Sequence, residues 1–246
     1  MVTLVGVGRV LIIKTGQTVP NVARRRGDFE LWIREGMGLH EDEVEVVEVY
    51  RGARPPAPER TEAIVVTGSA AMVTDAEAWS EATAGYLSAA LEAGAPMLAI
   101  CYGHQLLAHG NGGRVGDNPR GRQVGTIDVT LLPGAGGVDR LFGIFSQPLH
   151  VPVSHLQAVL ELPSAARRLA WSANDENHAF SLGPRAWGVQ FHPEFDADIV
   201  RGYIEARADT ISAEGLDPDA LAAAARDTDD GKRVLRRFAE LVGEQG

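Results

Sequence analysis

Three residues of the 246-residue chain have types and spacings that could carry out nucleophilic catalysis: Cys101, His192 and Glu194. Cys101 is the only cysteine, and it directly follows the apolar run from Met97 to Ile100. His192 and Glu194 flank Pro193 at the end of a second apolar run. A histidine at a fixed strand end can take the proton of a thiol, and a nearby carboxylate can orient the imidazole and support its charge. The pattern therefore predicts a triad of cysteine, histidine and acid.

The surroundings of Cys101 suit a nucleophile. The residues from Tyr102 to His109 predict a helix, so that Cys101 would lie on a tight turn between a strand and a helix. The N-terminus of that helix would stabilise a thiolate and leave the Tyr102 N–H available to an oxyanion. Ala99 and Gly103 are small, so the backbone can turn there without a side-chain clash. Taken alone, however, a lone cysteine among aliphatic residues is more often a small buried hydrophobe.

A zinc site is an alternative interpretation of the same residues. Structural zinc sites usually bring ligands in closely spaced pairs, whereas this chain has no second cysteine and no HExxH pair. His192 alone is equally compatible with a satisfied structural histidine. Gly6 and Gly8 lack the third glycine of a dinucleotide loop, and they precede a strand where that motif must follow one. We therefore expect no metal and no organic cofactor.

The composition limits the class of protein. A chain of this length with 45% hydrophobic residues can bury a sizeable core as one large α/β domain. The formal net charge of −10 argues against nucleic acid as a partner, and the basic run from Arg24 to Arg26 is expected to be a solvated loop or helix start. No window approaches ~18 uninterrupted apolar residues, so no membrane span is expected. The single cysteine and the lack of a leader pattern favour a cytoplasmic location.

Short aliphatic runs that alternate with helical patterns predict an α/β fold, in which an open, mostly parallel sheet has helices on both faces. In the first half of the chain, we expect strands at 9–14, 44–50, 63–67 and 97–100. A helix is expected at 75–93, with Asp75 as its N-cap and Gly94 after its end.

The second half of the chain has a different pattern. Short alternating runs predict a small antiparallel element, with strands at 124–132, 149–153, 168–172, 179–182 and 186–191. From residue 196 the spacing becomes helical, and breaks at 215–218 and 227–231 predict two or three helices. No repeat or linker interrupts the chain. We expect a single domain over residues 1–246, with a catalytic core at about 9–200 and a helical extension at about 201–246.

Two segments resemble a known family. The sequence Cys101-Tyr-Gly-His-Gln105 after an apolar strand, together with Gly-Val-Gln-Phe-His192-Pro-Glu194, resembles the class I glutamine amidotransferases. The segment Val66-Thr-Gly-Ser69 looks like the oxyanion loop of that family. Val153-Ser-His155 is similar to the segment that lines the glutamine pocket in its GMP synthase branch. The resemblance spans roughly residues 9–195, and it implies a flavodoxin-like architecture.

The opening of the chain narrows the resemblance. Lys14-Thr-Gly and Gly27-Asp-Phe-Glu30 look like the stand-alone proteins called GMP synthase-like, whose relatives include γ-glutamyl peptidases. The chain also departs from the family pattern. Ala99 stands where many relatives have glycine, Leu156 follows Ser-His where the synthase branch has glycine, and Gln157 replaces an acidic residue. Leucine beside the pocket could narrow it, so these departures bear on the substrate more than on the chemistry.

The resemblance implies a role for each matched residue. Cys101 would be the nucleophile, His192 the general base and then acid, and Glu194 the group that orients it. The amide of Tyr102, with one from Gly68 or Ser69, would form the oxyanion hole. The substrate-binding residues would be Gln105 and Ser154, which hold the α-amino and α-carboxylate end, with His155 beside them.

Three functions remain open at this point. The first is hydrolysis of glutamine with release of ammonia, which would need a separate synthetase subunit because no GxxxxGK[ST] loop occurs in the chain. The second is hydrolysis of a γ-glutamyl peptide or conjugate, which needs no partner. The third is a non-catalytic regulatory or binding subunit. The C-terminal helices could cover the sheet or form a homodimer contact.

Overall fold

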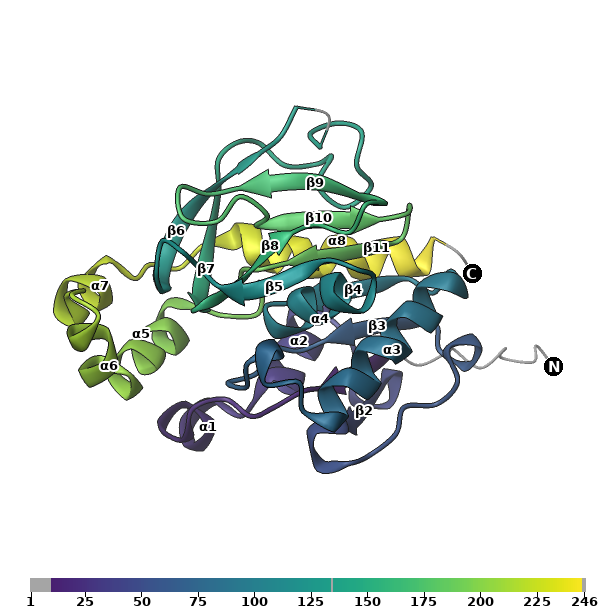
Figure 1. Ribbon diagram of the computed structural model, residues 1–246, viewed down its shortest axis with the longest axis horizontal. Helices are drawn as coiled ribbons and strands as arrows, with labels where there is room; N and C mark the ends of the chain where they lie inside the picture. The colour runs from purple at the N-terminus through teal and green to yellow at the C-terminus, as the bar shows by residue number, and fades with distance from the viewer. Residues whose placement is uncertain (1–9, 134, 245–246) are drawn as a thin grey trace.

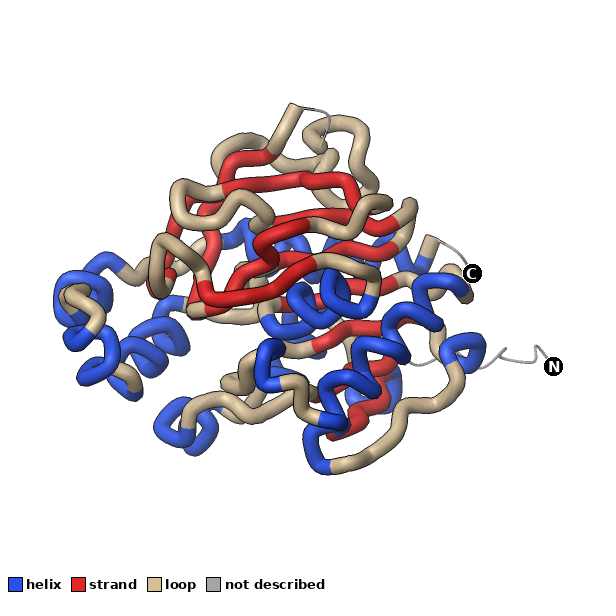
Figure 2. The backbone as a smooth tube through the Cα atoms, in the orientation of Figure 1, coloured by secondary structure: helices blue, strands red, loops and turns tan. Residues whose placement is uncertain are grey.

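The computed structural model describes residues 10–133 and 135–244, and its main feature is a nine-stranded sheet with helices on both faces (Figures 1 and 2). The strand order is β2-β1-β3-β4-β11-β10-β9-β6-β7. The first five strands in this order run parallel, and the remaining pairs are antiparallel. The strands are β1 (Val10–Lys14), β2 (Val44–Glu48), β3 (Ala63–Val66), β4 (Met97–Ile100), β6 (Gln123–Leu131), β7 (Leu149–His155), β9 (Ala166–Trp171), β10 (Ala179–Leu182) and β11 (Ala186–Val189).

This architecture confirms the predicted fold class. The antiparallel strands continue the main sheet beyond β11, and two further strands, β5 (Arg114–Asp117) and β8 (Gln157–Glu161), form a small antiparallel sheet of their own. Each predicted strand has a counterpart in the structure, with ends that differ by a few residues. Arg9, which was expected to begin the first strand, and the pair Gly6 and Gly8 lie outside the described residues.

The central strands are apolar throughout because both of their faces are covered. In β1, Val10 and Ile12 belong to one hydrophobic cluster, while Leu11 and Ile13 belong to the other. The first cluster includes residues of α2 (Phe29–Met37), α5 (Ala197–Ala206) and α8 (Asp229–Gly243). The second includes residues of α3 (Ala78–Glu92) and α4 (Tyr102–Gly110). Figure 1 shows α3 and α4 in front of the sheet and α8 behind it. Strands buried in this way read as continuous apolar runs.

The helix expected at 75–93 begins later than predicted. Asp75 lies in a 3-10 turn, Val73–Asp75, and the N-cap of α3 is Glu77. Ala76, at φ 50°, has a left-handed backbone that ends the turn and separates it from the helix. The prediction that Asp75 caps this helix is therefore wrong.

The basic run from Arg24 to Arg26 forms the last turn of α1 (Pro20–Arg26). Arg26 forms ion pairs with Asp196 and Asp198, and Arg25 pairs with Asp198. These acidic residues lie at the start of α5. The run is therefore the end of a helix, whereas a solvated loop or a helix start was expected. Its ion pairs tie α1 to the segment that follows His192 and Glu194.

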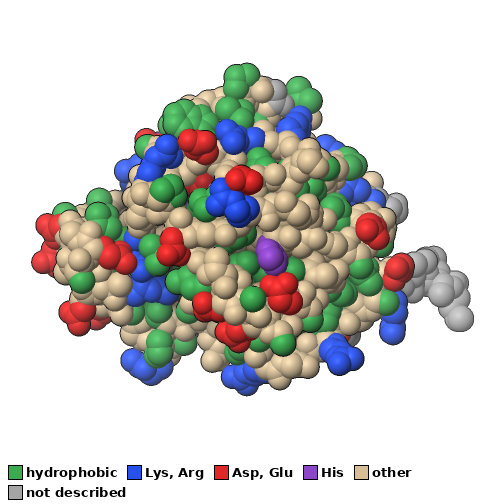
Figure 3. All heavy atoms as spheres, in the orientation of Figure 1, with side chains coloured by type: hydrophobic (Ala, Val, Ile, Leu, Met, Phe, Trp, Pro, Cys, Tyr) green, Lys and Arg blue, Asp and Glu red, His purple; other side chains and the backbone are tan. Residues whose placement is uncertain are grey.

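The described C-terminal part contains four helices, which is more than the two or three predicted: α5, α6 (Ala208–Ala213), α7 (Pro218–Ala224) and α8. The additional break occurs at Arg207, between α5 and α6. Helices α5 to α7 project at the left of Figure 1, and acidic side chains gather on this lobe in Figure 3. Among the described residues, no helix is long and apolar enough to cross a membrane. The exposed acidic residues of the lobe are Glu205, Asp209, Glu214, Asp217 and Asp219.

Candidate active site

Cys101 links β4 to α4 through a strained backbone. Its φ of 50° and ψ of −100° are rare for a residue with a side chain and cost about 1–3 kcal/mol. Two hydrogen bonds hold the turn: Cys101 N–H donates to Val189 O at 2.8 Å, and Gln105 N–H donates to Cys101 O at 3.1 Å. The cysteine side chain lines a pocket at this end of the sheet. Such strain is typical of a nucleophile on a tight strand-to-helix turn.

Small residues around the turn let the helix pack closely on the sheet. A β-carbon at Gly103 would lie 2.7 Å from Val66 Cβ, a distance too short for any larger residue without movement. Ala99 is fully buried, and it pairs with Val66 of β3 on one side and Gly188 of β11 on the other. Both residues are therefore at positions where little space is available, as the sequence predicted.

His192 follows β11 and is held in a fixed orientation. The backbone N–H of His192 donates to Pro152 O at 2.8 Å, and the ring nitrogen Nδ1 lies 2.8 Å from Glu194 Oε1. The Phe195 ring stacks on the imidazole with centroids 4.0 Å apart. Both side chains of the pair are buried, since 3% of the His192 side chain and 0% of the Glu194 side chain is exposed. The carboxylate therefore contacts the imidazole out of water.

The charge of this pair follows from its surroundings. Burial lowers the pKa of His192, but the charges of Glu194 and Cys101 and the hydrogen bonds to both side chains outweigh burial and raise that pKa to about 10. The other carboxylate oxygen, Glu194 Oε2, is buried and has no hydrogen-bond partner among the described residues. The imidazole is therefore set up to hold a proton between the sulfur and the carboxylate.

Gly68 brings the oxyanion loop against both side chains. A β-carbon at position 68 would lie 2.8 Å from His192 Cε1 and 3.6 Å from Cys101 Cβ. Three of the segments that carry the predicted site, which are far apart in the sequence, therefore meet at the carboxyl end of the parallel strands.

Two threonines fix the orientation of the loop. The hydroxyls of Thr15 and Thr67 donate to Gly68 O at 2.9 and 3.0 Å. In a trans peptide the C=O and N–H bonds point in opposite directions, so the Ser69 N–H points away from these threonines. Ser69 lines the same pocket as Cys101. Its amide is therefore preorganised as a hydrogen-bond donor.

Tyr102 can serve the site only through its main chain. It is the first residue of α4, so its N–H has no acceptor within the helix. Its hydroxyl forms a 2.7 Å hydrogen bond with Ser80 Oγ of α3, and burial raises the pKa of Tyr102 to about 12. The phenol is thus a packing group, and the amide is the part of this residue that can face an oxyanion.

The family model described as glutamine amidotransferase class-I matches residues 31–201. The chain belongs to the class I glutamine amidotransferase family. The matched segment contains the predicted nucleophile, base, acid and oxyanion loop.

Several proteins are similar to this chain. It is 35% identical to γ-glutamyl peptidase 5 of Arabidopsis thaliana over 105 residues. This match covers 42% of this chain and 42% of the peptidase. Over 151 residues it is 34% identical to a glutamine-hydrolyzing GMP synthase of Syntrophomonas wolfei, covering 59% of this chain and 28% of the synthase. The matches thus span less than two thirds of these relatives. A crystal structure of a glutamine amidotransferase from Thermotoga maritima superposes with a TM-score of 0.76 at 24% identity, covering 97% of this chain and 99% of that one. This structural similarity concerns the fold.

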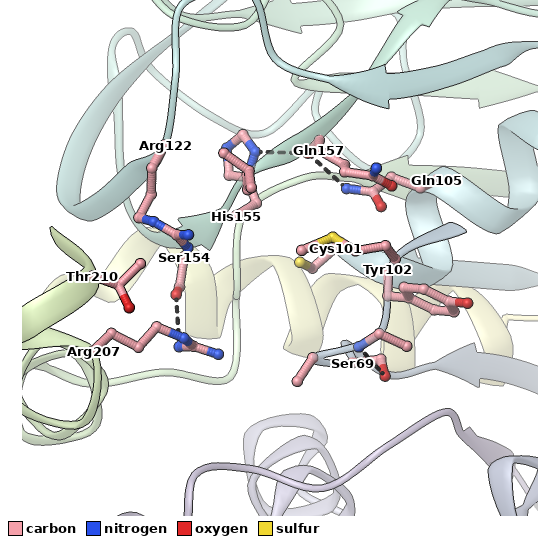
Figure 4. A pocket seen from close by; sticks show the side chains of 14 residues that line it. Ser69, Cys101, Tyr102, Gln105, Arg122, Ser154, His155, Gln157, Arg207 and Thr210 are labelled. Carbon is pink, nitrogen blue, oxygen red and sulfur yellow. Dashed lines mark hydrogen bonds between the residues drawn. The ribbon is translucent and has the colours of Figure 1, made fainter. Parts of the chain in front are cut away.

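The pocket beside Cys101 has a volume of about 230 Å³ and is lined by the predicted substrate residues Gln105, Ser154 and His155 (Figure 4). Gln105 directs its side-chain NH₂ to Gln157 O at 2.8 Å and to Gln190 Oε1 at 3.1 Å. The position of its amide is thus fixed by protein partners. The remaining lining residues are Ser69, Ala70, Ala71, Met72, Cys101, Tyr102, Arg122, Leu156, Gln157, Arg207 and Thr210.

His155 is more tightly held than a free ligand contact would be. It is buried, with Nδ1 3.0 Å from Gln157 O and Nε2 3.1 Å from Gln123 Oε1. Burial lowers its pKa to about 4. Because both nitrogens already have partners, the imidazole forms part of the pocket wall.

Sequence reasoning missed two arginines at the pocket. Arg122 lies at the start of β6 and forms two hydrogen bonds with Glu214, at 2.7 and 3.0 Å. Arg207 lies at the break between α5 and α6 and donates to Ser154 Oγ at 3.3 Å. Neither belongs to a motif, and their positions depend on how β6 and the C-terminal helices pack. No local signal in the sequence could have identified them.

One group of side chains could hold a metal ion. Donor atoms of His155, Asp175 and His178 lie within 4.8 Å of one another, and all three residues are buried. Burial raises the pKa of Asp175 to about 6 and lowers that of His178. A nitrogen- and oxygen-donor set of this kind suits a small transition metal, but ligation by His155 would replace one of its two hydrogen bonds. The expectation of no metal stays a prediction.

Proposed function

We propose that this amidotransferase cleaves the γ-glutamyl amide of glutamine through a γ-glutamyl thioester and releases ammonia. The observation that carries the proposal is the strained backbone of Cys101, which places the side chain in the pocket beside the buried pair of His192 and Glu194. A turn of this kind has an energetic cost, and strain of this kind clusters at reactive sites.

The proposed reaction has two halves, formation of the thioester and its hydrolysis, and His192 both accepts and donates a proton in the cycle. The Cys101 sulfur would bond to the δ-carbon of the substrate, with the thiol proton already held by His192. The amides of Tyr102 and Ser69 would hold the negative oxygen, and Gly68 is the alternative donor from the loop. As the C–N bond breaks, His192 would donate its proton to the departing ammonia. Water would then lose a proton to His192 and attack the thioester. The C–S bond would break to release glutamate, and His192 would return its proton to the Cys101 sulfur.

Hydrolysis of a γ-glutamyl peptide or conjugate is the second candidate. It is favoured by the extent of the pocket, which continues past Ser154 to Arg122, Arg207 and Thr210 (Figure 4). A relative named γ-glutamyl peptidase supports this alternative, and one named GMP synthase supports the first together with a separate synthetase partner. In either case, the bond to sulfur and the two proton transfers would be the same.

The test is to incubate the purified chain with glutamine or γ-glutamyl peptides and to measure ammonia and glutamate. Ammonia from glutamine that is lost in Cys101→Ser would support the glutaminase. Glutamate from peptides with little ammonia from glutamine would support the peptidase. If neither product forms with any substrate, both enzymatic functions would be rejected. The third candidate function, a non-catalytic regulatory or binding subunit, would then be favoured.

A further inference from the structure

Arg207 stands out among the pocket residues because its charge has no acidic partner. Its guanidinium lies over the Tyr203 ring, 4.8 Å from the centroid, and donates to Ser154 Oγ at 3.3 Å. Among the described residues, no carboxylate forms an ion pair with it. The neighbouring Arg122, by contrast, pairs with Glu214. Arg207 is thus a cation at the pocket held only by neutral groups.

The local backbone directs this side chain into the pocket. Arg207 ends α5 and precedes α6 with φ −121° and ψ 15°, and its N–H donates to Ile204 O at 3.2 Å. The break between the helices turns the residue toward Ser154 at the carboxyl half of β7. Figure 4 shows Arg207 and Arg122 on either side of Ser154, with Cys101 farther into the pocket.

The electrostatic surroundings of Arg207 leave a place for an anion. Burial lowers its pKa, Arg122 lowers it further, and Tyr203 and Cys101 act in the opposite direction. An arginine remains protonated in proteins, so the guanidinium stays charged. A partly desolvated cation without a counter-ion is costly, and a bound anion would offset that cost.

We propose that Arg207, together with Ser154 and supported by Arg122, forms a subsite that binds a carboxylate of the substrate. The flat guanidinium presents paired N–H groups that match a carboxylate, and the Ser154 hydroxyl adds a third donor. The inference rests on the proposed function, because it specifies the substrate of the same pocket. Two carboxylates have the required chemistry: the α-carboxylate of the γ-glutamyl group and the carboxylate of an amino acid leaving group.

Three ligands separate these two sources. γ-Glutamyl-glycine has both carboxylates, γ-glutamyl-ethylamide has only the α-carboxylate, and 4-aminobutanamide has neither. Binding of each to the full-length Cys101→Ser protein would be measured by calorimetry, with and without Arg207→Gln. This readout does not need turnover, so a failure of the proposed function would be recognised separately from a failure of the subsite.

The expected loss is about 10- to 100-fold in affinity, because hydrogen bonds to charged groups are worth factors of this size. If the α-carboxylate is the ligand, both γ-glutamyl compounds bind more weakly to Arg207→Gln. If the leaving-group carboxylate is the ligand, only γ-glutamyl-glycine does. In both cases 4-aminobutanamide is unaffected, and Arg207→Lys restores part of the affinity.

A matched control removes the same charge elsewhere. Arg226 has 57% of its side chain exposed and lies outside the pocket, so Arg226→Gln should leave all three affinities unchanged. The proposal is overturned if Arg207→Gln changes the affinity for both γ-glutamyl compounds by less than about twofold, well below the factor expected for a charged hydrogen bond. It is also overturned if all three ligands lose affinity equally, because that result indicates a general change in the pocket.

Discussion

Gly68 lies against the edge of the His192 imidazole, so close that a β-carbon at position 68 would be 2.8 Å from His192 Cε1. The same β-carbon would be 3.6 Å from Cys101 Cβ. The loop that is predicted to present the oxyanion donors thus also limits where the imidazole can lie. Glycine at this position is explained by the contact rather than by an unusual backbone angle.

Gly68→Ala should therefore reduce activity by displacing His192. The added methyl group must push the imidazole or the loop by several tenths of an ångström, and overpacking of this kind typically costs about 1–3 kcal/mol of stability. We expect kcat for γ-glutamyl hydrolysis to fall at least about tenfold, because proton transfer depends on the position of the base. Glutamate release and thermal unfolding would measure the two effects.

The matched control for this substitution is Gly85→Ala. Gly85 lies within α3, and a β-carbon there would meet no atom within 4 Å. Alanine should stabilise this helix by about 0.5–1 kcal/mol and leave kcat unchanged. Full activity in Gly68→Ala would show that the contact with His192 has no bearing on catalysis.

Glu194→Gln should lower the pKa of His192. In the native protein that pKa is raised from 6.5 to about 10, so the interaction stabilises the fold fully below pH 6.5 and is lost as the pH rises through about 10. The difference in unfolding free energy between the native protein and the variant should therefore be largest below pH 6.5 and should decline as the pH rises toward about 10. We expect kcat/KM to fall about 100-fold, since the base loses its orienting group. NMR titration of His192 and urea unfolding at several pH values would test both statements.

An exposed pair provides the comparison for this variant. His109 Nε2 lies 3.0 Å from Glu81 Oε1, with side chains that are 37% and 45% exposed. Glu81→Gln should leave kcat/KM unchanged, because water screens such a pair. If Glu194→Gln leaves the titration of His192 unchanged, the carboxylate does not control its proton.

The sequence predicted the central residues of the candidate site because they occur at the ends of apolar runs. Cys101 follows β4 and His192 follows β11, and the parallel pairing of these two strands brings both residues to one edge of the sheet. The sequence placed residues 186–191 in the antiparallel region, so this pairing was not predicted. The tight turn at Cys101 was expected, since small residues surround it.

The parts that could not be predicted depend on packing between distant segments. Arg207 reaches the pocket because α5 breaks there, yet the surrounding sequence keeps a helical pattern. Helix α2 was also not predicted, although Phe29, Trp32 and Ile33 are buried at helical spacing. A pattern of nine residues is short, and its stability comes from the contacts of α2 with α8 and the sheet rather than from its own propensity.

Lys14 should contribute strongly to stability, because it is a buried cation with acidic neighbours. Only 4% of its side chain is exposed, and Nζ lies 2.9 Å from Asp28 Oδ2 and 2.8 Å from Glu30 Oε2. Burial lowers the pKa of Lys14, but Glu30 and Asp28 outweigh it and raise the pKa. Lys14→Met would leave the carboxylates without their partner, so we expect a loss of about 3–5 kcal/mol in urea unfolding.

The pair of Arg114 and Glu161 is the control for this substitution, since these side chains are 58% and 66% exposed. Arg114→Met should cost no more than about 1 kcal/mol. Equal effects of the two substitutions would contradict the view that burial makes the Lys14 interactions important.

His178 should make the fold sensitive to acid. It is fully buried, and desolvation lowers its pKa well below 6.5, so it is neutral in the folded protein. The unfolded chain takes up a proton on this residue below pH 6.5, and the stability present above that pH is lost as the pH falls. The slope amounts to about 1.4 kcal/mol per pH unit for one histidine. We expect His178→Gln to reduce the pH dependence of the unfolding free energy by this amount between about pH 6 and 5. Urea unfolding at closely spaced pH values would measure the slopes, and an unchanged slope in His178→Gln would mean that this residue keeps a proton in the folded state.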